Sequence, residues 1–119
     1  MIVAIDQHGE RFAKKICTYK KYIAETRSEM EIMRLLNKHP EHAGYHHVVH
    51  LIAAIEDSRQ EGLEIVMDLY EGNLLDLMRD EHDKEIIVQL DEIIVRNVAR
   101  DISLALSYIN KCGVVHGDL

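Results

Sequence analysis

Five histidines lie within twelve residues in the first half of the chain, at positions 39, 42, 46, 47 and 50. Neutral imidazole binds Zn²⁺ and Ni²⁺, so such a tract could form a metal site. No C-x-x-C or H-E-x-x-H pattern accompanies it, and His39 is explained by Pro40, because a residue before proline ends a helix. We therefore expect an enlarged loop. The alternative, a metal-binding module, would take up metal stoichiometrically and lose it on substitution of His42, His46 and His47.

A lysine in an alternating segment near the N-terminus is a second candidate for chemistry. Residues 10–19 alternate as a strand, which places Ala13 and Lys15 on one face and Lys14 on the other. A lysine on the cleft-facing side of a strand can form an ion pair with a glutamate on the inward face of a helix, and that pair can also break. On position alone, Lys15 could equally be a solvated lysine, and Glu29 of the next helical segment an exposed helix glutamate.

The elements that must position these residues follow from hydrophobic periodicity. Alternation and apolar runs predict two hairpins, and a 3.6-residue period predicts a helix between them. The predicted order is strand 1–5, turn 6–9, strand 10–19, helix 21–38, strand 48–55, polar connector 57–62 and strand 63–68.

The longest periodic segment is a helix predicted over residues 91–111, after a short helix over 74–79 and a charged loop over 80–85. Asp91 suits the positive end of the long helix, Lys111 suits its negative end, and Gly113 suits a stop just beyond it. Helices segregated from an antiparallel sheet define the α+β class. The apolar stripe of the long helix consists of Ile94, Val98, Ile102, Ala105 and Ile109.

Composition narrows the function classes. The chain has 119 residues, and 14 Lys and Arg against 21 Asp and Glu give a formal net charge of −7. An acidic chain without a basic cluster predicts no nucleic-acid partner. The absence of a long apolar stretch and of a basic leader predicts no membrane association and no secretion. Cys17 and Cys112 are too far apart for a paired motif, which favours a cytoplasmic or other intracellular setting, the nucleus included.

Four segments in order resemble motifs of the protein kinase family. The last seven residues, GVVHGDL, follow a long amphipathic helix and resemble a kinase catalytic loop. Residues 12–15, FAKK, resemble the third-strand motif V-A-I-K, with Ala13 and Lys15 in the alanine and lysine positions. Residues 29–40 resemble helix αC with its His-Pro exit, and residues 63–70 resemble the fifth strand and the hinge. Each motif alone is weak, but their order and spacing together are specific.

The resemblance implies part of a eukaryotic-type protein kinase domain, from its second strand to the start of the catalytic loop. The implied fold is α+β and protein-kinase-like: an antiparallel small-lobe sheet with helix αC, plus the hinge and helices αD and αE of the large lobe. Residues 1–68 would form the small lobe, 69–72 the hinge and 73–119 the beginning of the large lobe. The implied activity is ATP-dependent phosphorylation of protein Ser/Thr hydroxyls, with Mg²⁺ as second cofactor. The preference for Ser/Thr over Tyr is a base-rate expectation.

The same resemblance implies roles for individual residues. Lys15 would place its charge on the ATP phosphates, Glu29 would hold Lys15, and Asp118 would accept the proton of the substrate hydroxyl. A polar loop at the chain end is the alternative for Asp118, and a core strand followed by a turn is the alternative for residues 67–73. The implied nucleotide pocket consists of Ala13, Lys15, the gatekeeper Met67, the backbone of Asp68 and Tyr70, and Asn73 near the ribose.

The sequence also departs from the family pattern. Gly117 replaces the arginine of the common H-R-D motif, which in the family often pairs with an activation-loop phosphate. The glycine-rich loop, the catalytic-loop asparagine, D-F-G and A-P-E are not among residues 1–119, so no family Mg²⁺ ligand is present. We therefore expect residues 1–119 alone to be inactive and unstable, with self-association through the exposed stripe of the long helix. The alternative function is a non-catalytic, pseudokinase-like scaffold, which need not bind nucleotide or magnesium.

Overall fold

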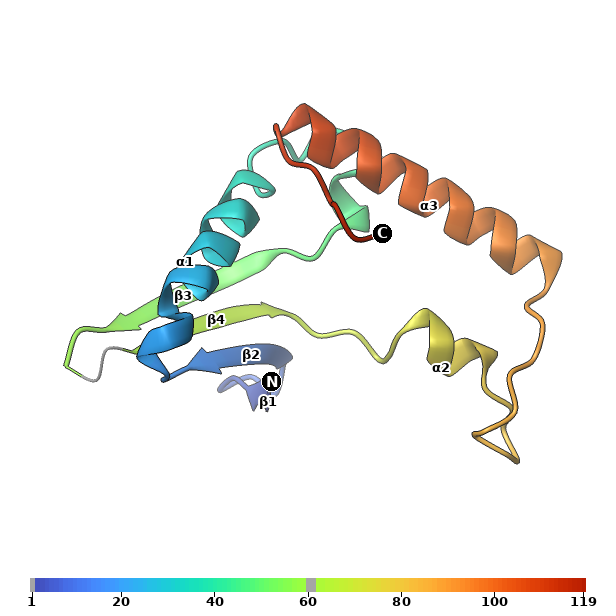
Figure 1. Cartoon of the computed structure of the whole chain (residues 1–119), viewed down its shortest axis with the longest axis horizontal. Helices are drawn as coiled ribbons and strands as arrows, with labels where there is room; N and C mark the ends of the chain where they lie inside the picture. Colours follow the sequence, from blue (N-terminus) through green and yellow to red (C-terminus); the bar gives the residue numbers. More distant parts are fainter. Residues whose placement is uncertain (1, 60–61) are drawn as a thin grey trace.

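A computed structural model gives the fold and describes residues 2–59 and 62–119 (Figure 1). Met1, predicted at the start of the first strand, lies outside the described residues, as do Gln60 and Glu61 of the predicted polar connector. No helix among the described residues is long and apolar enough to cross a membrane.

A four-stranded antiparallel sheet forms one part of the molecule, with the spatial order β1-β2-β4-β3. Both predicted hairpins are present. The third strand begins at Leu51 and not at the predicted position 48. Val49 instead packs against the hydrophobic cluster between the first helix and the sheet, and Val48 packs against a second cluster that contains Leu36, Tyr108 and Ile109. The strands are β1 (Ile2–Ile5), β2 (Arg11–Cys17), β3 (Leu51–Asp57) and β4 (Gly62–Asp68).

Helix α1 (Lys20–Leu35) packs on one face of this sheet and buries Thr26, Met30 and Met33. The predicted end at residue 38 is wrong, because the chain leaves the helix three residues earlier. The last turn is tightened, because the Asn37 and Lys38 N–H groups donate to carbonyls three residues earlier. The Asn37 side chain also donates to the Leu51 carbonyl at 2.9 Å, which holds this turn to β3. The first hydrophobic cluster consists of Ala13, Met30, Met33, Leu63, Ile65 and Met67.

The long helix α3 (Glu92–Lys111) matches the prediction over residues 91–111 within one residue. Asp91 caps its N-terminus by accepting a hydrogen bond from the Ile93 N–H at 2.8 Å. Gly113 follows its C-terminus with a φ of +78°, a left-handed conformation that favours glycine. The short helix α2 (Leu74–Met78) is capped at its N-terminus by Asn73, which forms a reciprocal capping box with Asp76.

Tyr108 joins α3 to the part of the molecule that contains α1. Its side chain is fully buried, and its hydroxyl donates to the Leu36 carbonyl at 2.6 Å. The same hydroxyl accepts from the His39 N–H at 3.3 Å. Burial raises the pKa of Tyr108, so the phenol stays protonated and able to donate. The tyrosine therefore satisfies two backbone groups in the chain just beyond α1.

The loop between α1 and β3 approaches α3 so closely that only glycine fits at position 44. A Cβ atom on Gly44 would overlap the Leu104 carbonyl and lie 2.7 Å from the Tyr108 Cβ. Gly44 directly precedes the short 3₁₀ helix η1 (Tyr45–His47), whose Tyr45 ring contacts the Tyr108 ring edge-on. The half of the chain that contains the sheet and α1 and the half that contains α2 and α3 thus meet at this loop.

Histidines of the tract make contacts that stabilise this loop. The His50 ring stacks on Tyr45, and its nitrogens contact the Asn37 Oδ1 at 2.9 Å and the Tyr45 carbonyl at 2.6 Å. His42 accepts from the Gly44 N–H at 2.9 Å. Across residues 2–59 and 62–119, no group of three or more His, Cys, Asp or Glu side chains could hold a metal ion. His42 and His50 therefore have structural partners within the protein.

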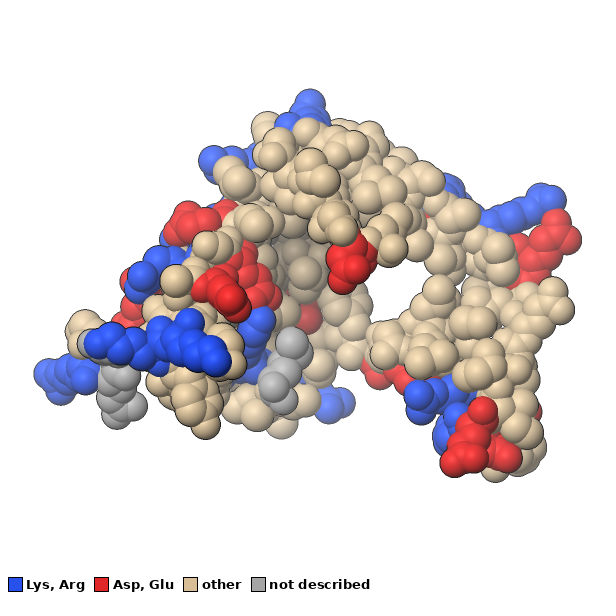
Figure 2. Space-filling view, viewed as in Figure 1, with Lys and Arg blue, Asp and Glu red and all other residues tan. Residues whose placement is uncertain are grey.

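The apolar stripe of α3 is partly covered, which corrects the expectation that all of it is exposed. Ile109 is 7% exposed and packs with Leu36 and Tyr108, whereas Ile94 and Ile102 are 40% and 38% exposed. Charged side chains gather over the sheet, α1 and the loop after α2, and are sparse over most of α3 on the face seen in Figure 2. The loop after α1 therefore covers the C-terminal end of the stripe.

We predict that Tyr108→Phe destabilises the natural protein by about 1–3 kcal/mol, because it leaves the buried Leu36 carbonyl without its donor. Urea unfolding measures this change. Tyr19→Phe, at a tyrosine that is 74% exposed, should change stability by less than about 0.5 kcal/mol. Equal effects of the two substitutions would show that the Tyr108 hydroxyl does not hold the halves together.

Candidate functional site

The centre of the candidate site is an ion pair between β2 and α1. Lys15 Nζ lies 2.5 Å from Glu29 Oε2, and both side chains are 41% exposed. The predicted contact between these residues is therefore present. Lys14 points to the opposite face of the sheet and pairs with Glu64 at 3.0 Å. The alternation that selected Lys15 over Lys14 is thus confirmed.

The local sequence explains this geometry. Ala13 and Cys17 share the face of Lys15 and are buried under α1, so β2 has a fixed orientation in the sheet. In α1, Glu29 immediately precedes the buried Met30 and emerges beside it. A half-exposed ion pair is screened by water and contributes only about 0.2–1 kcal/mol, so Lys15 can exchange Glu29 for another anion at little cost.

Two cavities border the ion pair. One, of about 310 Å³, is lined by Lys15, Cys17, Tyr22 and Glu29 among others. The second, of about 570 Å³, contains Glu29 together with Met67. Anionic groups in the first cavity would meet the ammonium group of Lys15.

Ala13 and Met67, two of the residues expected around a nucleotide, lie directly opposite each other in the β2–β4 ladder. Ala13 is 3% exposed and Met67 is 7% exposed, so both belong to the first hydrophobic cluster. The strand that carries Met67 continues into the segment expected to form the hinge. The structure thus brings Ala13, Lys15, Glu29 and Met67 together beside one helix.

The expected hinge residues line a different cavity, of about 710 Å³, that Tyr70, Asn73 and residues of α2 and α3 form. The Asn73 side chain accepts from the Asp76 N–H at 2.9 Å, so capping of α2 already engages it. Burial raises the pKa of Tyr70, and the negative charge of Asp68 acts in the same direction. The structure does not place Tyr70 and Asn73 around the two cavities that border the Lys15–Glu29 pair.

Asp118 lies in the exposed segment that follows α3. Its backbone N–H donates to His116 Nδ1 at 3.1 Å, and Gly117 between them has a φ of +79°. His116 lines an apolar cavity of about 530 Å³ between α1 and α3. Asp118 does not line either cavity that borders the Lys15–Glu29 pair. Its role in proton transfer stays a prediction.

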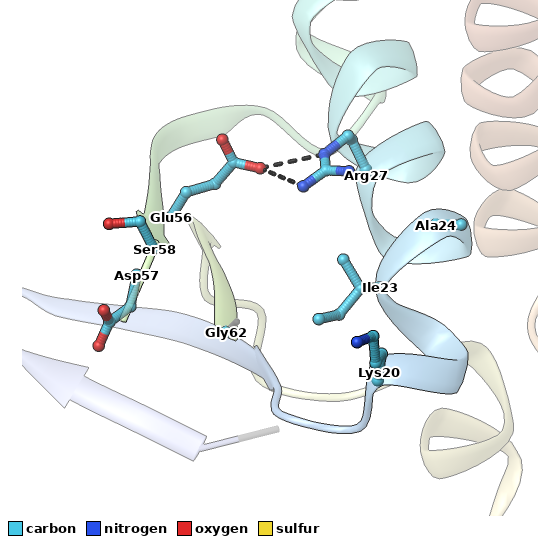
Figure 3. Close-up of a pocket in the computed structure, with 8 residues that line it drawn as sticks. All are labelled: Lys20, Ile23, Ala24, Arg27, Glu56, Asp57, Ser58 and Gly62. Atoms are coloured by element: carbon cyan, nitrogen blue, oxygen red, sulfur yellow. Dashed lines mark hydrogen bonds and ion pairs between the residues drawn. The ribbon is translucent and has the colours of Figure 1, made fainter. Parts of the chain in front are cut away.

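Sequence reasoning missed a second ion pair on α1. The Nε and Nη2 atoms of Arg27 both donate to Glu56 Oε1 on β3, at 3.0 and 2.7 Å. Figure 3 shows this contact at the edge of a cavity between α1 and the β3–β4 hairpin. No local pattern could reveal it, because the two residues are 29 positions apart and belong to different elements.

The family model of the protein tyrosine and serine/threonine kinases matches residues 6–119. A search of curated proteins gives no match. Together with the four-stranded antiparallel sheet and its helices, the family match corresponds to a protein-kinase-like α+β fold.

We predict an energetic coupling of about 0.2–1 kcal/mol between Lys15 and Glu29 in a double-mutant cycle of Lys15→Met and Glu29→Gln, followed by urea unfolding. The physical reason is the direct, half-exposed contact of the two charges. A control cycle combines Lys15→Met with Glu25→Gln, a carboxylate one turn earlier on α1 that lines the same cavity, and should give a smaller coupling. Equal coupling in both cycles would contradict a specific pair.

Proposed function

Since the chain belongs to the protein tyrosine and serine/threonine kinase family, we propose that it forms part of an enzyme that phosphorylates protein Ser and Thr hydroxyls with ATP. The family membership implies protein phosphorylation in general, and kinases of this family generally use ATP and Mg²⁺. The choice of Ser/Thr over Tyr is our proposal. We also propose that residues 1–68 form the small lobe, 69–72 the hinge and 73–119 the beginning of the large lobe.

The observation that carries the proposal is the Lys15–Glu29 ion pair. Phosphoryl transfer requires positioning and charge neutralisation more than covalent chemistry by the protein. Lys15 would contribute one positive charge to the α- and β-phosphates of ATP, and Glu29 would hold the ammonium group in place. Both residues border a cavity into which an anion can enter.

The other residues fit ATP to different degrees. Ala13 and Met67 are buried in the first hydrophobic cluster and would form the apolar wall behind an adenine ring, and the backbone of Asp68 and Tyr70 would bind the edge of that ring. The Asn73 Oδ1 already caps α2 by accepting from the Asp76 N–H, so Asn73 would offer the ribose the N–H donors of its Nδ2. ATP, when bound, supplies the phosphoryl group, while these side chains position it.

The residues present do not fit magnesium. Among the described residues no cluster could hold a metal ion, and residues 1–119 contain no D-F-G motif. We therefore assign no step to the metal in this part of the protein. Asp118 would orient the substrate hydroxyl and accept its proton, which a carboxylate can do without being a strong base.

The partly exposed stripe of α3 favours a second proposal, self-association of residues 1–119 when they are produced alone. Ile94 and Ile102 remain substantially exposed, and exposed apolar patches favour association. A scaffold function without catalysis would use this surface and would not require ATP. Nucleotide binding distinguishes this scaffold function from the proposed kinase function.

We predict that Lys15→Met weakens ATP binding by the complete natural protein at least tenfold and reduces phosphorylation of Ser/Thr peptides. The reason is loss of the charge that faces the phosphates. Lys14→Met removes a lysine from the opposite face of the same strand and should leave both measurements nearly unchanged. Isothermal titration and peptide-phosphorylation assays provide the measurements. Failure of the unmodified protein to bind ATP would favour the scaffold, and exclusive use of Tyr peptides would contradict the Ser/Thr proposal.

We predict that the complete enzyme does not depend on phosphorylation of its activation loop. Gly117 lacks the cation that would bind such a phosphate, and its left-handed φ of +79° is strained for arginine. Phosphatase treatment should leave peptide phosphorylation unchanged relative to a sample given heat-inactivated phosphatase. Loss of activity only in the treated sample would contradict this prediction.

A further inference from the structure

Two ion pairs hold α1 from opposite sides. Successive residues of an α-helix are rotated by about 100°, so Arg27 and Glu29 are separated by about 200° in one direction around the helix axis and about 160° in the other. The buried residues Thr26, Met30 and Met33 lie between these two directions, facing the sheet. Arg27 and Glu29 therefore flank the buried stripe, one on each side.

The sheet order supplies a partner on each side. Strand β4 lies between β2 and β3, and the buried side chains of α1 pack over it. Glu29 pairs with Lys15 of β2, whereas Arg27 pairs with Glu56 of β3. A rotation of α1 about its axis that shortens one of these contacts must lengthen the other.

We propose that the Arg27–Glu56 ion pair is a positioning clamp that sets the rotation of α1 and thereby places Glu29 against Lys15. The helix position follows from the structure alone. The consequence for ATP binding rests on the proposed function. Arg27 and Glu56 are positioning residues, because they act through Glu29 and do not line either cavity that borders the Lys15–Glu29 pair.

Apolar packing leaves the rotation of α1 weakly determined. Two of its three buried residues are methionines, whose unbranched side chains adapt to shifts of the helix. Tyr19, at the N-terminal cap, makes no side-chain capping bond. Directional polar contacts are therefore needed to select one orientation near Glu29.

The region around Arg27 is open where packing could otherwise fix the helix. A cavity of about 430 Å³ separates the N-terminal half of α1 from the β3–β4 hairpin (Figure 3). Ile23 and Ala24 line it from the helix, and Glu56 lines it from the strand. The Arg27 guanidinium reaches Glu56 at this cavity with two donors on one oxygen, a geometry that a lysine could not reproduce.

The clamp has a modest strength, which suits an adjustable element. The two side chains are 55% and 54% exposed, so water and salt screen their attraction. Contacts of this kind change an equilibrium about 1.4- to 5-fold. The clamp should therefore tune the Lys15–Glu29 contact without deciding whether the protein folds.

The test compares variants of the complete natural protein at low salt. Arg27→Gln and Glu56→Gln each remove one side of the clamp, and the double exchange Arg27→Glu with Glu56→Arg restores an opposite-charge pair. Arg34→Gln is the matched control, because Arg34 pairs with Glu31 at 2.7 Å within α1 and with similar exposure. The first measurement is acetylation by a trace of acetic anhydride, read by mass spectrometry as the ratio of Lys15 to Lys14. The second measurement is the dissociation constant of ATP.

We expect each Gln variant to raise the Lys15-to-Lys14 ratio and to weaken ATP binding about two- to fivefold, with a melting temperature lowered by at most a few degrees. The exchange variant should return both values toward those of the unmodified protein, and Arg34→Gln should change neither. A structural role unrelated to Glu29 would not alter the labelling ratio selectively.

Two outcomes separate this inference from the proposed function. Normal ATP binding with no change of either measurement in Arg27→Gln and Glu56→Gln would overturn the clamp and leave the kinase proposal intact. A raised labelling ratio in a protein that does not bind ATP would support the clamp and overturn the kinase proposal. A change of the same size in Arg34→Gln would also overturn the clamp, because any lost charge on α1 would then suffice.

Discussion

The hydrogen bond from the Tyr108 hydroxyl to the Leu36 carbonyl is the interaction on which the relative placement of the two halves depends. The chain crosses from the sheet to α2 through an extended segment (Figure 1), in which Leu69 packs against the first hydrophobic cluster and residues 70–73 are exposed. The halves meet again where the loop after α1 contacts the C-terminal half of α3. Buried polar groups must be paired, so the two backbone groups that Tyr108 satisfies fix this loop and the helix together.

This junction links a structural contact to the candidate site. Leu36 follows directly after α1, the helix that carries Glu29, so the loop held by Tyr108 fixes the C-terminal end of that helix. The Arg27–Glu56 contact lies near the middle of the helix. Glu29 lies between these attachments, in a pair weak enough for Lys15 to exchange partners. The helix is thus held near its middle and at its C-terminal end, while the contact between Glu29 and Lys15 remains labile.

Prediction from the sequence succeeded where the signal was local. The alternation over β2 separated Lys15 from Lys14, and the apolar period together with Asp91 and Gly113 located α3 within one residue. It failed at the end of α1, where Asn37 leaves the helix to bind the Leu51 carbonyl, and it treated the stripe of α3 as wholly exposed. In both places a partner distant in sequence outweighed local propensity.

The sequence by itself determined the types and order of the elements, the face of β2 that carries Lys15, and the family to which four ordered motifs pointed. Periodicity and turn residues act over a few positions, so they can be recognised in the amino-acid sequence alone. Only the tertiary structure decided that Gly44 must accommodate α3, that Tyr108 joins the halves, and that Arg27 faces Glu56. These contacts join residues separated by 29 to 72 positions, and no local rule specifies which distant surfaces meet.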